Sequence, residues 1–188
     1  MNFPELNEAV RILREGGVIL YPTDTVWGLG CDATNAEAVE KIFRIKQRED
    51  AKSLITLMNG SDMLCRYVRQ VPEIAWSLIE VNDQPMTLVY PGAQGLAPKA
   101  VAEDGSAAIR IPQHDFCLQL ITRLQRPLIS TSANRSGAQA PARFAEISAE
   151  IREAVDWVAP QAYEKGATGK PSSLMKLGLG GEIQIIRP

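Results

Sequence analysis

Apolar residues recur at helical spacing in the first fifty residues of the chain. Within residues 5–15 they follow an i, i+3, i+4, i+7 stripe that Gly16 and Gly17 close, which predicts an amphipathic helix. A second helix is predicted to start at Thr34 and Glu37, which have the spacing of a capping box, and to end near Arg48. Further helical patterns cover residues 61–69, 72–80, 115–124 and 144–155.

Short apolar runs rich in β-branched residues alternate with these helices. They predict strands at residues 18–21, 53–58, 86–90, 107–111, 128–131, 172–177 and 182–187, the last two joined by a turn at 178–181, whereas residues 23–30 are expected to form a loop. Because strands and helices interleave throughout, we expect a mixed sheet covered by helices on both faces.

Composition limits the classes of function. The chain has 188 residues, 45% of them hydrophobic, as expected for one ordinary folded domain over residues 1–188. Its 20 Lys and Arg against 22 Asp and Glu give a net charge of −2, which excludes a histone-like cationic surface. Any contact with nucleic acid must therefore be local.

Cysteine and histidine usage excludes several kinds of site. Three cysteines without a CxxC pair argue against a disulfide framework or a zinc ribbon and favour a reduced cytoplasmic setting. His114 is the one histidine, so His-rich metal sites are excluded, and we expect this side chain to be structural. No signal peptide or membrane span is visible in the sequence.

Two glycine-containing segments resemble nucleotide-binding loops only superficially. Residues 166–172, Gly-Ala-Thr-Gly-Lys-Pro-Ser, lack the Walker spacing and place Pro171 after the lysine. Gly28-Leu-Gly30 lacks the third glycine of the dinucleotide fingerprint. Both are interpreted as glycine-permitted turns.

Three polar features each leave more than one interpretation open. Lys46 and Arg48 are either cations that interact favourably with a helix C-terminus or a clamp that binds polyphosphate. Residues 130–137, Ser-Thr-Ser-Ala-Asn-Arg-Ser-Gly, follow the end of a strand. They suit either a turn capped by its own Ser and Thr hydroxyls or a site for ribose and phosphate. Arg110, inside an apolar strand, needs an internal salt bridge, an exposed position or a substrate carboxylate.

Taken together and in order, four separated segments resemble the YrdC family, which includes threonylcarbamoyl-AMP synthases of the TsaC type. The segments are Tyr21-Pro-Thr-Asp-Thr25-Val-Trp-Gly-Leu-Gly30, Lys46-Gln-Arg48, Ala108-Ile-Arg-Ile-Pro112 and Ser130-Thr-Ser-Ala-Asn134-Arg-Ser-Gly137. Pro171-Ser-Ser173 and Ile186-Arg-Pro188 are similar to the closing motifs of the family. The resemblance implies a single-domain α+β fold, with a twisted mixed sheet flanked by helices around a concave, positively charged cavity.

The resemblance also implies an activity. L-threonine, bicarbonate and ATP, with Mg²⁺, would yield threonylcarbamoyl-adenylate and pyrophosphate for the modification of tRNA. The threonine amine captures carbon dioxide as a carbamate, which attacks the α-phosphorus, so the protein supplies positioning and charge rather than a nucleophile. Downstream tRNA-modification proteins are the implied partners, and direct contact with tRNA or double-stranded RNA is a further possibility.

Roles carried over by motif position fall into three groups. Lys46 and Arg48 are expected at the ATP phosphates in the catalytic centre. The threonine end of the site is expected to be formed by Thr25, Arg110, Ser130 and Ser172, with Thr23 as a less certain neighbour. The nucleotide end is expected to be formed by Lys52, Ser106, Ser132, Asn134 and Arg187.

Several departures from the family pattern keep two alternatives open. Glu49 and Ser53 stand where prolines are common, and Ala140 replaces a hydroxyl residue, so one ATP contact is expected to be missing. These changes leave room for a YciO-like paralogue that acts on another nucleotide substrate. A non-catalytic RNA-binding module is the other alternative, although the net charge of −2 argues against it.

Overall fold

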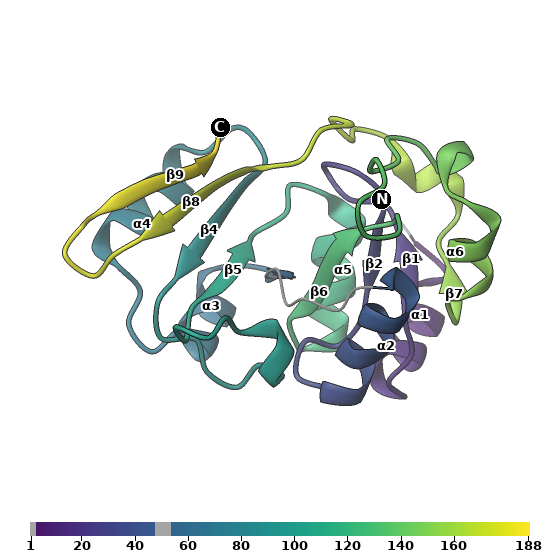
Figure 1. Cartoon of the computed structure of the whole chain (residues 1–188), viewed down its shortest axis with the longest axis horizontal. Helices are drawn as coiled ribbons and strands as arrows, with labels where there is room; N and C mark the ends of the chain where they lie inside the picture. The colour runs from purple at the N-terminus through teal and green to yellow at the C-terminus, as the bar shows by residue number, and fades with distance from the viewer. Residues whose placement is uncertain (1–2, 48–53) are drawn as a thin grey trace.

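The computed structural model describes residues 3–47 and 54–188, and its strands form one mixed sheet (Figure 1). The strand order is β7-β1-β2-β6-β3-β5-β4-β8-β9, with parallel pairing between β1 and β7, β3 and β5, and β4 and β8. The strands are β1 (Ile19–Tyr21), β2 (Gly28–Gly30), β3 (Ile55–Leu57), β4 (Met86–Tyr90), β5 (Ala107–Arg110), β6 (Leu128–Ser132), β7 (Trp157–Val158), β8 (Ser173–Leu177) and β9 (Ile183–Arg187).

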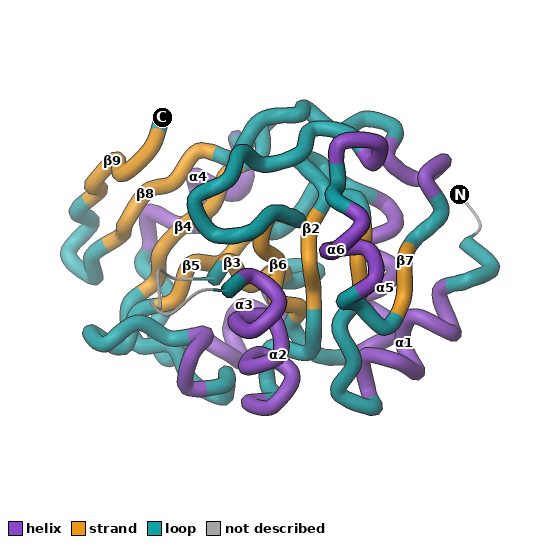
Figure 2. The backbone as a smooth tube through the Cα atoms, turned by 45° about the vertical axis from the view of Figure 1, so that its right-hand side comes forward, coloured by secondary structure: helices purple, strands orange, loops and turns teal. Residues whose placement is uncertain are grey.

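Helices cover both faces of this sheet, as predicted. In Figure 1, α4 lies behind β8 and β9, and α2 lies in front of the other half of the sheet. Figure 2 shows the same arrangement turned by 45°, with α6 beside β7. The helices are α1 (Leu6–Arg14), α2 (Ala36–Lys46), α3 (Ser61–Tyr67), α4 (Glu73–Val81), α5 (Asp115–Leu124) and α6 (Ala149–Glu153). None of the described helices is long and apolar enough to cross a membrane.

Two predicted helix boundaries are wrong. The side chain of Asn35, rather than that of Thr34, caps α2 by accepting a hydrogen bond from the Ala38 amide at 3.1 Å. The helix expected over residues 144–155 is divided into a 3₁₀ turn at Phe144–Glu146 and the short α6. Ser148 separates the two because its hydroxyl caps α6 at the amide of Ile151.

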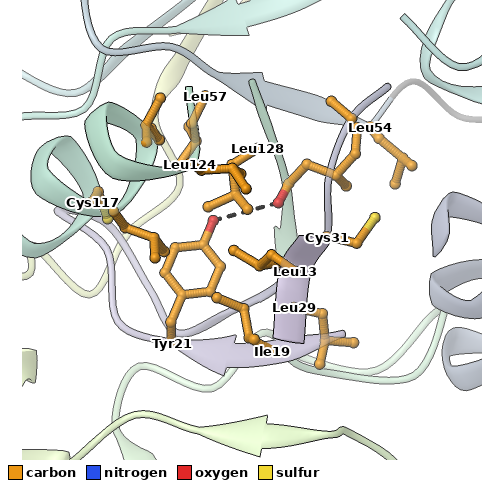
Figure 3. Packing of buried hydrophobic residues seen from close by; sticks show 14 of the residues in the cluster. Leu13, Ile19, Tyr21, Leu29, Cys31, Leu54, Leu57, Cys117, Leu124 and Leu128 are labelled. Carbon is orange, nitrogen blue, oxygen red and sulfur yellow. Dashed lines mark hydrogen bonds between the residues drawn. The ribbon is translucent and has the colours of Figure 1, made fainter. Parts of the chain in front are cut away.

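The strand β2 was not expected, because two of its three residues are glycines, which have low strand propensity. The structure explains their presence. A Cβ atom at Gly30 would lie 2.6 Å from the Tyr21 ring, which packs across β2 in the core (Figure 3). The glycines of β2 therefore make room for a buried tyrosine, and ladder hydrogen bonds to β1 and β6 supply the strand geometry.

Candidate functional site

A cavity of about 180 Å³ opens on one face of the sheet, where chain segments distant in the sequence meet. Residues at paired positions share this face: Ile55 pairs with Ser130 of β6, and Ser132 pairs with Gly28 of β2. The lining residues are Thr23, Thr25, Val26, Gly28, Ile55, Arg110, Ser130, Thr131, Ser132, Ala140, Pro171, Ser172 and Arg187.

The loop between β1 and β2 brings two threonines to the cavity in a fixed hydrogen-bond chain. The Thr23 hydroxyl donates to the Val26 carbonyl at 2.8 Å, so the Thr25 hydroxyl donates to Thr23, also at 2.8 Å. Thr25 in turn accepts a hydrogen bond of 3.0 Å from Arg110 Nη1. Backbone carbonyls of this loop accept hydrogen bonds from the amides of Thr168 and Gly169, so it also anchors the segment that leads to β8.

Arg110 reaches the cavity from β5 and is 4% exposed. Its Nη2 lies 3.4 Å from Oδ1 of Asp24, a carboxylate that also accepts a hydrogen bond from the Gln113 amide. The internal salt bridge that the sequence left open is therefore present. It leaves Arg110 Nε and Asp24 Oδ1 without hydrogen-bond partners among the described residues. A buried guanidinium with an unused donor is suited to receive a carboxylate or phosphate.

Lys46 fixes the loop that follows β6. Its ammonium group donates to the backbone carbonyls of Ser132 at 2.6 Å and of Asn134 at 2.7 Å, and the side chain is buried. The Asn134 amide group donates to the carbonyls of Arg135 and Ala138, and its buried Oδ1 has no hydrogen-bond partner among the described residues. The turn is therefore closed by the Asn134 side chain rather than by a Ser or Thr hydroxyl, and the Lys46 ammonium group binds two of its carbonyls.

The opposite wall of the cavity comes from β8 and β9. Ser172 Oγ lies 2.7 Å from the hydroxyl of Thr87, and the Ser172 carbonyl accepts a hydrogen bond of 2.8 Å from Arg187 Nε. Burial, and then the positive charge of Arg110, lower the pKa of Arg187. The two guanidinium groups therefore repel each other, and an anion between them would relieve the repulsion.

Most of the predicted site residues meet at this cavity. Thr25, Arg110, Ser130, Ser132, Ser172 and Arg187 line it, as does Thr23. Asn134 lies in the adjoining loop, and Lys46 contacts that loop from the end of α2. The Ser106 hydroxyl instead donates a hydrogen bond of 2.6 Å to Asp104, and Ser106 does not line the cavity. Arg48 and Lys52 fall outside the described residues.

The structure also identifies polar residues that the sequence interpretation missed. Asp24 pairs with Arg110, and Thr87 contacts Ser172. Asp104 binds Ser106 and Lys176, and these contacts hold the pKa of its carboxyl group well below the ordinary value. The Asp-x-Ser spacing of residues 104–106 is a turn signal that was available in the sequence, whereas nothing local distinguishes Thr87.

His114 plays the structural part expected of it. Its Nε2 lies 3.1 Å from the Tyr163 carbonyl, and burial lowers the pKa of the imidazole. The side chain does not line the cavity described above. A His-based catalytic mechanism therefore has no support in the described geometry.

Comparisons with known proteins agree with the resemblance seen in the sequence. The profile of the Sua5/YciO/YrdC family, described as telomere recombination, matches residues 11–188. The chain is 34% identical over 182 residues to a threonylcarbamoyl-AMP synthase of Pseudomonas aeruginosa, covering 96% of this chain and 95% of that protein. It is 37% identical over 158 residues to the synthase of Halorhodospira halophila, covering 82% of each.

Solved structures support the same assignment. The crystal structure of P. abyssi Sua5 complexed with L-threonine matches with a TM-score of 0.84 and 27% identity, over 92% of this chain and 51% of that chain. This protein therefore spans about half the length of that Sua5. E. coli YciO matches with a TM-score of 0.80 and 25% identity over 97% of this chain and 87% of that chain. The chain belongs to the Sua5/YciO/YrdC family.

Proposed function

We propose that this protein is a threonylcarbamoyl-AMP synthase, which condenses L-threonine, bicarbonate and ATP to threonylcarbamoyl-adenylate and pyrophosphate. The observation that carries the proposal is the cavity, in which the buried Arg110, the partly buried Arg187 and a row of hydroxyl groups face one another. The synthases of P. aeruginosa and H. halophila, similar along most of the chain, support it.

Arg110 and Thr25 form the proposed threonine end of the cavity. The substrate carboxylate binds the guanidinium of Arg110, and Ser130 and Ser172 offer hydroxyl groups to its polar atoms. The threonine nitrogen bonds to carbon dioxide derived from bicarbonate and loses a proton to solvent, which gives a carbamate. No protein nucleophile is needed, in agreement with a site made of cations, hydroxyls and backbone groups.

The proposed nucleotide end lies toward β6 and β9. Ser132, Asn134 and Arg187 hold the nucleotide, and Ser106 and Lys52 are assigned to the same end. Lys46 and Arg48 complete the phosphate clamp, with Lys46 acting from beneath the loop that it fixes. A carbamate oxygen bonds to the α-phosphorus as the bond to pyrophosphate breaks, and the cations stabilise the charge that develops on the phosphate oxygens.

Mg²⁺ is proposed to enter with ATP. Among the described residues, no group of three or more His, Cys, Asp and Glu side chains is placed to hold a metal ion. Mg²⁺ would then be held mainly by phosphate oxygens and water, which is how it commonly binds nucleotides. When bound, it would neutralise charge on the phosphates.

The product is a reactive mixed anhydride, so we propose that downstream tRNA-modification proteins receive it in the cytoplasm. Direct contact with tRNA or double-stranded RNA is a separate proposal. A salt titration of RNA binding tests it, because phosphate contacts weaken steeply as salt rises.

Pyrophosphate release by the purified chain tests the proposed function. The reaction contains ATP and Mg²⁺, and threonine or bicarbonate is omitted in turn, with serine in place of threonine as the specificity control. Release that requires both substrates and favours threonine is expected. A folded protein that releases no pyrophosphate, or releases it regardless of threonine, would overturn the proposal and favour a YciO-like or RNA-binding function.

A further inference from the structure

The two faces of the β8–β9 hairpin have different neighbours. Ile183 pairs with Leu177 and Ile185 with Met175, and Met175 pairs in turn with Leu88 of β4. Leu88 of β4 and Ile79 of α4 line a second, smaller cavity, so this face of the hairpin lies on the α4 side of the sheet. Regular alternation would place residue 187 on the same face as residues 183 and 185.

Arg187 is nevertheless on the opposite face, at the functional cavity. It pairs with Leu174, which pairs with Thr87 of β4, and the Thr87 hydroxyl contacts Ser172 at the cavity wall. Directly opposed residues share a face of a sheet, so Arg187 shares the face of Thr87. Its Nε bond of 2.8 Å to the Ser172 carbonyl confirms this orientation.

An irregularity in the ladder explains the change of face. Ile185 pairs with Met175 and Arg187 pairs with the adjacent Leu174, so Ile186 is an extra residue in β9. Such a β-bulge redirects the side chains that follow it, and bulges are common beside active sites. Ile186 is 52% exposed, so burial in the core does not account for a large apolar residue here.

We propose that the strand register beside the bulge at Ile186, which keeps Arg187 opposite Leu174, positions Arg187 at the nucleotide end of the cavity. The inference rests on the proposed function, because it concerns how Arg187 reaches ATP. It goes further in assigning the position of Arg187 to its pairing with Leu174 rather than to any contact that Ile186 makes. A change in chain length before Arg187 should therefore matter only if it moves the arginine away from Leu174.

Deletion and insertion distinguish positioning from a merely structural role. Deleting Ile186 removes the extra residue, and in the straightened strand the arginine takes the place opposite Leu174. Inserting one alanine between Ile186 and Arg187 moves the arginine away from Leu174. Arg187→Ala serves as the reference for complete loss of the contact, and Ile186→Ala, which keeps the chain length, is the matched control.

The readout is the KM for ATP and for threonine in pyrophosphate release, together with direct ATP binding. We expect Arg187→Ala and the insertion to raise the KM for ATP about 10- to 100-fold, the range for a lost charged hydrogen bond. The deletion and Ile186→Ala should stay within about threefold of the wild type, and all four variants should leave the KM for threonine within about threefold.

Two results would overturn the inference: a deletion as harmful as Arg187→Ala in a variant that unfolds like the wild type, or an insertion without effect on the KM for ATP. If Arg187→Ala itself leaves the KM for ATP unchanged, the proposed role of this register also fails. Failure of the proposed function would be seen separately, because the wild type would then release no threonine-dependent pyrophosphate.

Discussion

Two aspartate–arginine pairs show how the same residue types are used in different surroundings. Asp32 pairs with Arg126 at 2.6 Å, and its other carboxylate oxygen accepts two hydrogen bonds from Thr34. The Arg126 side chain is 50% exposed. This pair is fully hydrogen-bonded on the carboxylate side, and it holds the turn that leads into α2.

The pair at the cavity is built differently. Asp24 and Arg110 are both almost fully buried, their closest charged atoms are 3.4 Å apart, and each has a polar atom without a partner among the described residues. Leaving a buried polar group unpaired costs about 1–3 kcal/mol, which a bound ligand can offset. The comparison therefore separates a pair with a satisfied carboxylate from one that, in the proposed function, the substrate completes.

Arg110→Ala should have the largest effect. It removes the proposed carboxylate contact, so the KM for threonine should rise about 100-fold while the KM for ATP changes less than about threefold. It also leaves Asp24 buried without a counter-charge, which costs about 3–5 kcal/mol in the free energy of unfolding. Steady-state kinetics and urea unfolding measure the two effects.

Arg110→Lys is the companion variant because it keeps the charge and loses the planar fork. It should fold better than Arg110→Ala and still bind threonine weakly. An unchanged KM for threonine in either variant would contradict the assignment of Arg110.

Asp24→Asn breaks the same pair from the other side. The amide is nearly isosteric, but it leaves the Arg110 cation without its counter-charge, so the free energy of unfolding should fall by about 3 kcal/mol. A substrate carboxylate would replace the missing negative charge. Threonine should therefore raise the melting temperature of this variant more than that of the wild type, and equal shifts would argue against the proposed site.

Asp32→Asn is the matched structural control. It weakens the bond to Arg126 and leaves the Arg126 cation in solvent, where an unpaired charge costs little. The expected loss in the free energy of unfolding is about 1–3 kcal/mol, with both KM values unchanged. A selective rise in the KM for threonine would remove the distinction between the two pairs.

Ala140→Ser should have the smallest effect, and in the favourable direction. Ala140 lines the cavity, at a position where the family resemblance implies a hydroxyl residue. A restored hydrogen bond is worth about 0.5–1.5 kcal/mol, so the KM for ATP should fall about two- to tenfold. Ala138→Ser, outside the cavity lining, is the control, and equal changes in both variants would show that position 140 does not contact ATP.

Periodicity predicts the large elements of this fold well, because burial imposes it. Residues 86–90 and 115–124 form β4 and α5 with the predicted limits. The short strands β2 and β7 escape prediction because pairing with neighbouring strands, rather than local preference, holds them in place: β2 pairs with β1 and β6, and β7 pairs with β1. The division at Ser148 depends on a single cap within an otherwise helical pattern.

The candidate site was predictable where a residue is unusual for its surroundings. Arg110 in an apolar strand required a partner, and the structure supplies Asp24 while leaving room for another anion. The role of Lys46 beneath the Ser132–Asn134 turn was not predictable, since its acceptors are backbone carbonyls of a segment more than eighty residues away. The placement of Arg187 on the cavity face depends on the register of β9 against β8, which the alternation of side chains along the sequence does not reveal.

Product capture with ¹³C-labelled bicarbonate tests the central claim most directly. The wild type, with ATP, Mg²⁺ and threonine, should form an adenylate that carries the label by mass spectrometry. Arg110→Ala at low threonine concentration should form little of it, and Asp32→Asn should match the wild type. A labelled adenylate formed equally by Arg110→Ala would move the threonine site elsewhere, and its absence with folded wild-type protein would contradict the account.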